Sequence, residues 1–130
     1  MTRTVCVGKP SEKMELIYQT VLKAQLETIK IIKSGVKASE LDKTARDIIS
    51  DAGYRDNFGH SLGHGVGMEI HEVPVASYLS TETLEENMIV TVEPGIYLPG
   101  EFGDRIEDFV VVKPDGCFNM TLSPKELIIL

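Results

Sequence analysis

The chain has 130 residues, 42% of them hydrophobic and 25% charged, which is the length and composition of one globular domain with a buried core. Its net charge of −7 argues against a nucleic-acid or anionic-membrane partner, because both rely on clustered lysine and arginine. There is no apolar run near the roughly 20 residues of a membrane span, and no signal-peptide pattern. Two cysteines without a C-x-x-C spacing predict reduced thiols and a cytoplasmic location.

The beginning of the chain predicts a strand and then a long helix. The segment Thr2–Val7 is rich in β-branched residues and is followed by glycine and proline, which favours a short strand. Ser11 can cap a helix that extends to Lys33, because apolar residues recur in this range at mostly helical spacing. Gly35 is a natural stop for that helix.

A second helix is predicted from Ser39 to Ala52. Ser39 and Asp42 are three residues apart and resemble a capping arrangement, and Gly53 follows as a stop. After Asn57 the pattern changes to short β-rich segments separated by glycine, proline and asparagine. The clearest predicted strands are Met88–Val92, Asp108–Val112 and Leu127–Leu130, and Pro114–Gly116 is a predicted turn.

Two histidines lie in a glycine-rich segment, Gly59–Gly67. His60 and His64 are four residues apart, a spacing that would place them on one face of a helix. The glycines disfavour a helix, so we expect a strand or bulge whose missing Cβ atoms let a ligand or another backbone approach closely. Both imidazoles could then face one pocket. A structural role for this segment stays open as the alternative.

Two glutamates lie next to apolar segments. Glu93 ends the segment Met88–Val92 and precedes a Pro-Gly turn, and Glu107 precedes another apolar run. A carboxylate in such a place must be paired or bound to a cation. Glu93 could form a salt bridge with Arg105. As a set, however, two carboxylates and one imidazole without a thiolate suit a divalent ion such as Mn²⁺, Co²⁺, Fe²⁺ or Zn²⁺.

In order and spacing, these segments resemble the pita-bread metallopeptidases, which include Xaa-Pro dipeptidase (prolidase), aminopeptidase P and methionine aminopeptidase. The resemblance covers essentially the whole chain, and the matching segments are Gly63–Gly67, Ile70–Pro74, Val92–Tyr97, Arg105–Asp108 and Ser123–Leu127. The stretches Glu-Pro-Gly-Ile-Tyr and Ser-Pro-Lys-Glu-Leu are most similar to the Xaa-Pro dipeptidase and aminopeptidase P branch. The resemblance implies an α+β fold, a partial pita-bread (creatinase/aminopeptidase) fold with two helices on one face of a curved antiparallel sheet.

The resemblance also implies roles for individual residues. His64, Glu93 and Glu107 would be metal ligands, with Glu107 bridging two ions. Glu93 would also accept a proton from the attacking water. His71 would contact the scissile carbonyl, and His60 would line the substrate pocket. Arg105 would form a hydrogen bond behind the ligands or hold the substrate.

The family uses two further aspartate ligands, the second directly before a segment resembling Met1–Thr4, so we expect a chain truncated just after that aspartate. We assign no metal role to Asp42, Asp47, Asp51 or Asp56. We therefore expect residues 1–130 to be the C-terminal portion of the catalytic domain, without its first half and without the N-terminal domain, and to bind at most one ion, with Mn²⁺ ahead of Co²⁺ and Zn²⁺.

The resemblance implies a metal-dependent exopeptidase that acts on proline-containing peptides, impaired in this chain. The alternative is a non-catalytic fragment or interaction module that retains the fold. A metal-free, creatinase-like enzyme is less consistent with three filled ligand positions. We also expect self-association, most simply as a homodimer, through an open sheet edge and partly covered helices.

Overall fold

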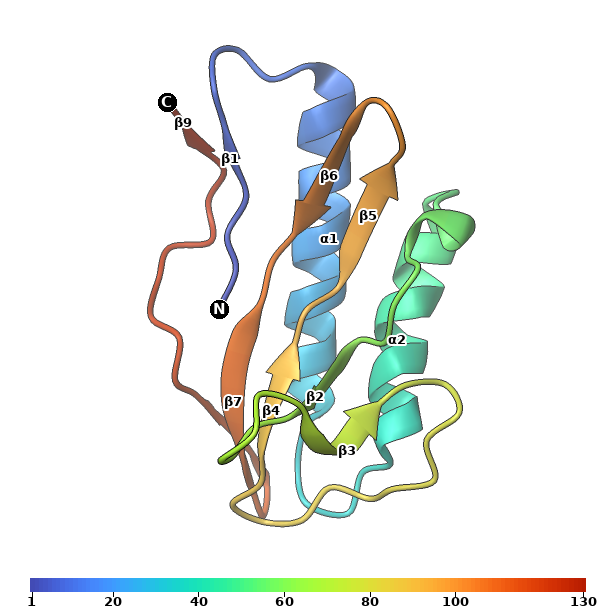
Figure 1. The fold of residues 1–130 in the computed structure, drawn as a ribbon, viewed down its shortest axis with the longest axis vertical. Coiled ribbons are helices and arrows are strands. Elements are labelled where there is room, and N and C mark those ends of the chain that lie inside the picture. The colour runs from blue at the N-terminus through green and yellow to red at the C-terminus, as the bar shows by residue number, and fades with distance from the viewer.

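A computed structural model describes residues 1–130. Two long helices lie side by side and cover one face of a sheet (Figure 1). The helices are α1 (Glu12–Ile31) and α2 (Ala38–Asp51), and a short 3₁₀ turn, η1 (Arg55–Asn57), follows α2. The strands are β1 (Val5–Cys6), β2 (Gly63–Gly65), β3 (Glu72–Ala76), β4 (Ile89–Val92), β5 (Gly95–Leu98), β6 (Phe102–Arg105), β7 (Asp108–Lys113), β8 (Gly116–Asn119) and β9 (Ile128–Ile129).

Both predicted helices are confirmed within two residues at each end, but only one predicted cap is. The Ser11 side chain accepts a hydrogen bond of 3.2 Å from the Met14 amide, which caps α1. The expected Ser39–Asp42 cap is wrong, because α2 begins after Lys37 without a side-chain cap and the Asp42 carboxylate is engaged elsewhere. Gly53 follows α2 with a φ of 88°, as a helix stop requires.

The strands form one main sheet and two small ones. The main sheet has the order β3-β2-β4-β7-β8, and each neighbouring pair is antiparallel. Strands β5 and β6 form an antiparallel ribbon, and β1 pairs with β9 in parallel, so the two ends of the chain run side by side (Figure 1). The predicted strand Thr2–Val7 is shorter than expected, since outside β1 only Thr2 pairs, in an isolated bridge with Glu107.

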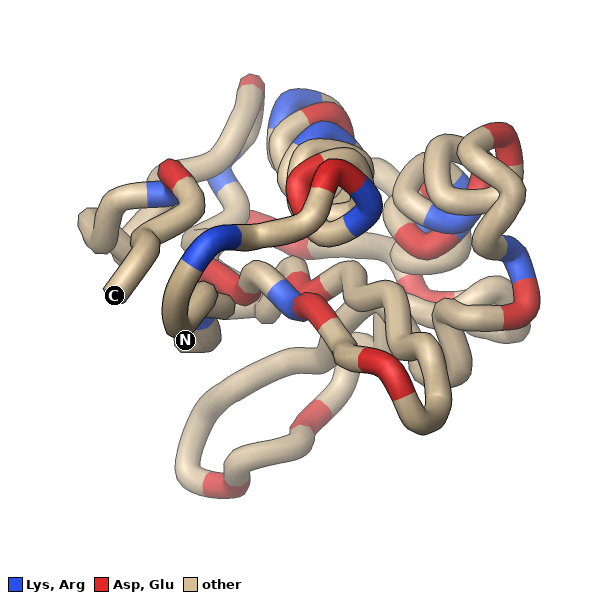
Figure 2. The backbone as a smooth tube through the Cα atoms, turned by 90° about the horizontal axis from the view of Figure 1, so that it is seen from above, with Lys and Arg blue, Asp and Glu red and all other residues tan.

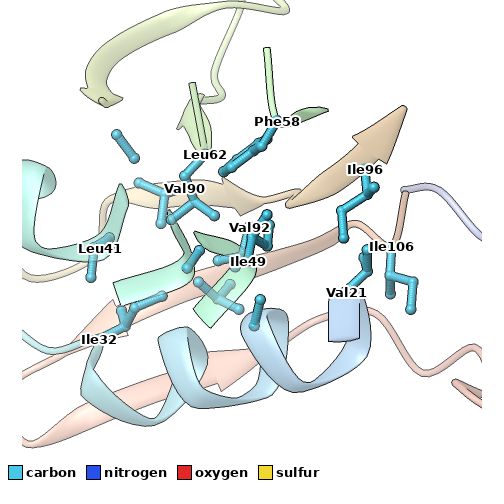
Figure 3. Close-up of a cluster of buried hydrophobic side chains, with 14 of the residues drawn as sticks. Val21, Ile32, Leu41, Ile49, Phe58, Leu62, Val90, Val92, Ile96 and Ile106 are labelled. Atoms are coloured by element: carbon cyan, nitrogen blue, oxygen red, sulfur yellow. The ribbon is translucent and has the colours of Figure 1, made fainter. Parts of the chain in front are cut away.

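The core lies between the two helices and the main sheet. Eighteen buried residues form one cluster, in which Val21 of α1, Ile32 directly after α1 and Ile49 of α2 meet Val90 and Val92 of β4 (Figure 3). All five of these side chains are fully buried. The sheet covers most of the apolar faces of the helices, but Leu16, Leu26 and Ile31 of α1 stay 60%, 39% and 36% exposed, in line with the expected partial coverage.

Further exposed apolar side chains lie on the opposite face of the main sheet. Val110 and Val112 of β7 point into the core, so the residue between them, Val111, points away from it. The register places Val111 between Ile89 and Phe118, and Phe118 is 60% exposed. We call Ile89, Val111 and Phe118 the apolar row.

A buried polar cluster joins the N-terminal segment to the start of β7. All five N–H groups of the Arg3 guanidinium are used, at 2.8–3.0 Å. They donate to the carbonyl oxygens of Thr2, Glu107, Ser123 and Pro124 and to the carboxylate of Asp108. Burial alone would raise the pKa of Asp108, but hydrogen bonds from Lys125, Asn119 and Arg3 outweigh it and lower that pKa. The cluster therefore fixes the backbone at Glu107 and Asp108.

The charged residues are distributed as the net charge of −7 leads one to expect, without a basic surface (Figure 2). Lysine and arginine segments are interspersed with acidic ones along the backbone and form no continuous basic stripe (Figure 2). Neither helix combines the length and the hydropathy that crossing a bilayer requires.

Candidate active site

The site is built around β2, whose two glycines let it fit between β4 and β3. A Cβ atom on Gly63 would lie 2.1 Å from the carbonyl oxygen of Thr91, and one on Gly65 would lie 2.2 Å from that of Val73. The pairing with β3 shifts register between His64 and Gly65. The sequence-based expectation of a glycine-rich strand with a bulge is confirmed, although His60 lies in the loop before it.

His64 and Glu93 face each other at the centre of the site. The His64 Nε2 and Glu93 Oε1 atoms are 3.2 Å apart, and both side chains are about 15% exposed. His64 Nδ1 lies 3.0 Å from the carbonyl oxygen of Gly65, which can only accept, so Nδ1 carries a hydrogen. The Nε2 atom of a neutral His64 therefore presents a lone pair to a carboxylate, and this arrangement requires a proton or a metal cation between the two atoms.

Thr91 supports this pair, and sequence reasoning missed it. The buried Thr91 hydroxyl donates to Glu93 Oε1 over 3.1 Å and accepts from the His64 amide over 2.9 Å. One side chain thus orients both residues. The available signal was its position two residues before Glu93, which places both side chains on the same face of the extended backbone.

The third expected ligand, Glu107, does not join the other two. Its carboxylate accepts a hydrogen bond of 2.5 Å from the Thr2 hydroxyl and lies 3.6 Å from the amino group of Met1. The structure gathers no group of three or more potential metal-binding side chains. Glu107 does line a cleft of about 520 Å³ together with His64 and Glu93. The three side chains thus border one cleft, but they do not come close enough together to form one metal site.

His60, Tyr97 and Arg105 form a second group in the site. The Tyr97 hydroxyl lies 2.8 Å from His60 Nε2 and 3.5 Å from Arg105 Nη1. The hydrogen bond to Tyr97 raises the pKa of Arg105, against the effect of its burial. Arg105 forms no ion pair with Glu93, so the alternative of such a salt bridge is wrong. Its buried Nε atom has no partner, which leaves one donor free. Sequence reasoning gave Tyr97 no role of its own.

The two groups share an open cleft of about 620 Å³. It is lined by His60, His64, His71, Glu93 and Arg105, among others. The ring centroids of His64 and His71 are 4.3 Å apart. Imidazole, carboxylate and guanidinium groups around one cleft can bind a divalent ion, polarise a carbonyl and hold a carboxylate. The residues fit one ion at the His64–Glu93 pair, and they do not form a complete site for two.

This fold and this cleft place the chain in a known class, because the sequence model of metallopeptidase family M24 matches residues 1–114. The chain belongs to that family. It is 47% identical over 128 residues to the Xaa-Pro dipeptidase of Pyrococcus horikoshii, a match that covers 98% of this chain and 36% of that protein.

Solved structures agree with this assignment. The Xaa-Pro dipeptidase from Bacillus anthracis superposes with a TM-score of 0.96 at 52% identity, over 98% of this chain and 36% of that one. The X-Pro aminopeptidase from Thermotoga maritima gives 0.95 at 46% identity, over the same shares. The expected α+β pita-bread fold and the family are therefore confirmed, and the chain spans about a third of the length of these relatives.

Proposed function

We propose that these 130 residues carry part of the active site of a metal-dependent exopeptidase that hydrolyses Xaa-Pro bonds, as a dipeptidase or an aminopeptidase. The observation that carries the proposal is the His64–Glu93 pair, whose facing lone pairs at 3.2 Å call for a cation in a cleft that also holds His71 and Arg105. The names of the relatives support the proline-containing substrate.

In this proposal His64, Glu93 and Glu107 are the metal ligands, and the ion is Mn²⁺, with Co²⁺ or Zn²⁺ as alternatives. A bound divalent ion would supply Lewis-acid activation of water and carbonyl. Glu93 would accept the water's proton, His71 would contact the scissile carbonyl, and His60 would line the substrate pocket. Arg105, which lines the cleft, would hold substrate or form a hydrogen bond behind the ligands.

We further propose that these 130 residues, as the C-terminal portion of a catalytic domain, are impaired on their own. They bring together only two of the three expected ligands, and a misplacement of about 1 Å can cost on the order of 10²-fold in rate. A non-catalytic module that retains the fold is the alternative function.

Hydrolysis assays test this proposal. The purified chain is incubated with Mn²⁺ and Leu-Pro, with Leu-Ala as the control peptide and Lys43→Met as a control variant outside the cleft. We expect slow or no release of proline, and any turnover should require His64. Turnover equal to that of a complete relative would refute the impairment. Hydrolysis of Leu-Pro that survives His64→Ala would refute the site.

We also propose that the chain self-associates, as a homodimer in the simplest case. The edge strands β3 and β8 and the half-exposed apolar row support this, because open edges and apolar patches favour association. Sedimentation equilibrium over a wide concentration range is the test. A species of twice 14.4 kDa is expected, and a monomer at all concentrations would refute it.

A further inference from the structure

The ion pair between Asp42 and Arg46 of α2 also makes hydrogen bonds outside the helix. Asp42 and Arg46 are one helical turn apart and form two hydrogen bonds, of 2.8 Å (Nε to Oδ2) and 2.9 Å (Nη2 to Oδ1). The Asp42 side chain is fully buried, and the Arg46 side chain is 23% exposed. A buried pair of this kind is kept only when the remaining donors and acceptors are also satisfied.

Those remaining groups all reach the loop between η1 and β2. Arg46 Nη1 donates to the carbonyl oxygen of Phe58 over 2.8 Å, and Nη2 donates to that of His60 over 2.9 Å. The Leu62 amide donates to Asp42 Oδ1 over 3.1 Å. The guanidinium also lies 4.3 Å from the centre of the Phe58 ring. The ion pair therefore holds every second residue of the loop.

Before Leu62, whose carbonyl oxygen accepts from the Glu93 amide over 2.9 Å, the loop has no other backbone support. None of the backbone–backbone hydrogen bonds outside helices and strands involves residues 58–61. Buried backbone groups need partners, and here the side chains of α2 supply them. The position of the loop thus depends on Asp42 and Arg46.

The loop in turn fixes the ring of His60. The Nδ1 atom lies 2.8 Å from the carbonyl oxygen of Ser61, so Nδ1 carries the hydrogen and Nε2 accepts from the Tyr97 hydroxyl at 2.8 Å. The Phe58 ring packs perpendicular to the same ring, with centroids 5.0 Å apart. His60 is thereby presented to the cleft in one tautomer.

We propose that Asp42 and Arg46 are positioning residues that hold His60 in its Nδ1–H tautomer at the wall of the cleft. The inference rests on the proposed function only for the use of the cleft as a substrate site. The same helix offers a matched control, because Lys43 and Asp47 form a pair with the same spacing, at 71% and 59% exposure. Neither of these two side chains bonds to the loop.

The test is a measurement of ring ¹⁵N chemical shifts in the metal-free chain. The three histidines can be followed separately, and the shifts report which nitrogen carries the hydrogen. In Arg46→Gln and Arg46→Lys we expect the Nδ1–H fraction of His60 to fall by about twofold or more, because neither side chain reproduces the planar fork. His64 and His71 should keep their shifts in both variants, and Lys43→Met should leave all three unchanged.

Unchanged His60 shifts in a folded Arg46→Gln protein would overturn the proposal. If both Arg46 variants unfold, the ¹⁵N signals of the Arg46 guanidinium in the wild-type protein test the proposal. Bonds to two loop carbonyls should keep its Nη1 and Nη2 signals separate, whereas one averaged signal would show free rotation and refute the proposal. No substrate or metal enters either measurement, so a failed hydrolysis assay leaves the result standing.

Discussion

Replacing Asp104 with valine is expected to stabilise the protein at neutral pH. Asp104 of β6 is 3% exposed, and neither carboxylate oxygen has a hydrogen-bond partner. Burial raises the pKa of Asp104, and the nearby Thr4 hydroxyl and Arg105 amide lower it only in part. These two groups bond to each other instead: the Thr4 hydroxyl donates to the Arg105 carbonyl oxygen and accepts from the Arg105 amide, both over 3.1 Å. Removing an unsatisfied buried group should gain about 1–3 kcal/mol.

The gain should depend on pH in a defined direction. A carboxyl with a raised pKa in the folded state favours folding fully below its unfolded pKa, and this contribution is lost as the pH rises through the folded pKa. The advantage of Asp104→Val should therefore grow from acid to neutral pH. In a chain of this length it corresponds to about 4–12 °C in melting temperature at neutral pH.

Thermal unfolding followed by circular dichroism at about pH 3 and pH 7 measures this difference. Asp104→Asn is the matched control, because it removes the charge and keeps an unsatisfied polar group. Its gain over the wild type should rise with pH in the same way, because the titrating carboxyl is gone, but should be smaller at each pH. A melting temperature that falls at neutral pH, or the same gain at both pH values, would refute the reasoning.

Three further outcomes are expected. Asp108→Asn should cost about 3–5 kcal/mol at neutral pH. Because the folded pKa of Asp108 is lowered, the difference should shrink as the pH falls through that value, and urea unfolding against pH measures it. Gly63→Ala, with its Cβ 2.1 Å from the Thr91 carbonyl, should lower the melting temperature and weaken metal binding, whereas Gly116→Ala, with open space around it, should change neither. After dialysis against Mn²⁺, elemental analysis should find at most one ion per chain and none in His64→Ala, and two retained ions would contradict the ligand count.

Local sequence signals predicted the elements well where one physical cause dominates. The helical spacing of apolar residues located α1 and α2, and glycine marked their ends. The strands β1, β4, β7 and β9 were predicted with bounds that differ from those observed, and β3, β5, β6 and β8 were expected only as unspecified short β-rich segments, because pairing partners set where a strand begins and ends. Outside β1, Thr2 pairs only with Glu107, which is distant in sequence.

The candidate site was predictable in its members and not in its geometry. Spacing and family resemblance named His64 and Glu93, which the structure places in contact. They did not name Thr91, whose spacing from Glu93 was a signal, while its bond to the His64 amide joins β4 to β2 and is visible only in the structure. Asp42 shows the same limit, since its local pattern resembled a helix cap while its actual partners include the distant Leu62 amide.

The polar cluster around Arg3 has a consequence for how the molecule opens. The family match ends at residue 114, yet Arg3 donates to the carbonyl oxygens of Ser123 and Pro124, beyond that boundary. The Arg3 side chain therefore joins residues 123–124 to the first residues of the chain, and it also donates to the carbonyl oxygen of Glu107. Segments linked in this way unfold together, so we expect amide hydrogen exchange to release the N-terminal segment, the start of β7 and residues 123–130 as one cooperative unit. Removal of residues 123–130 should therefore also speed amide exchange at the start of β7, next to Glu107.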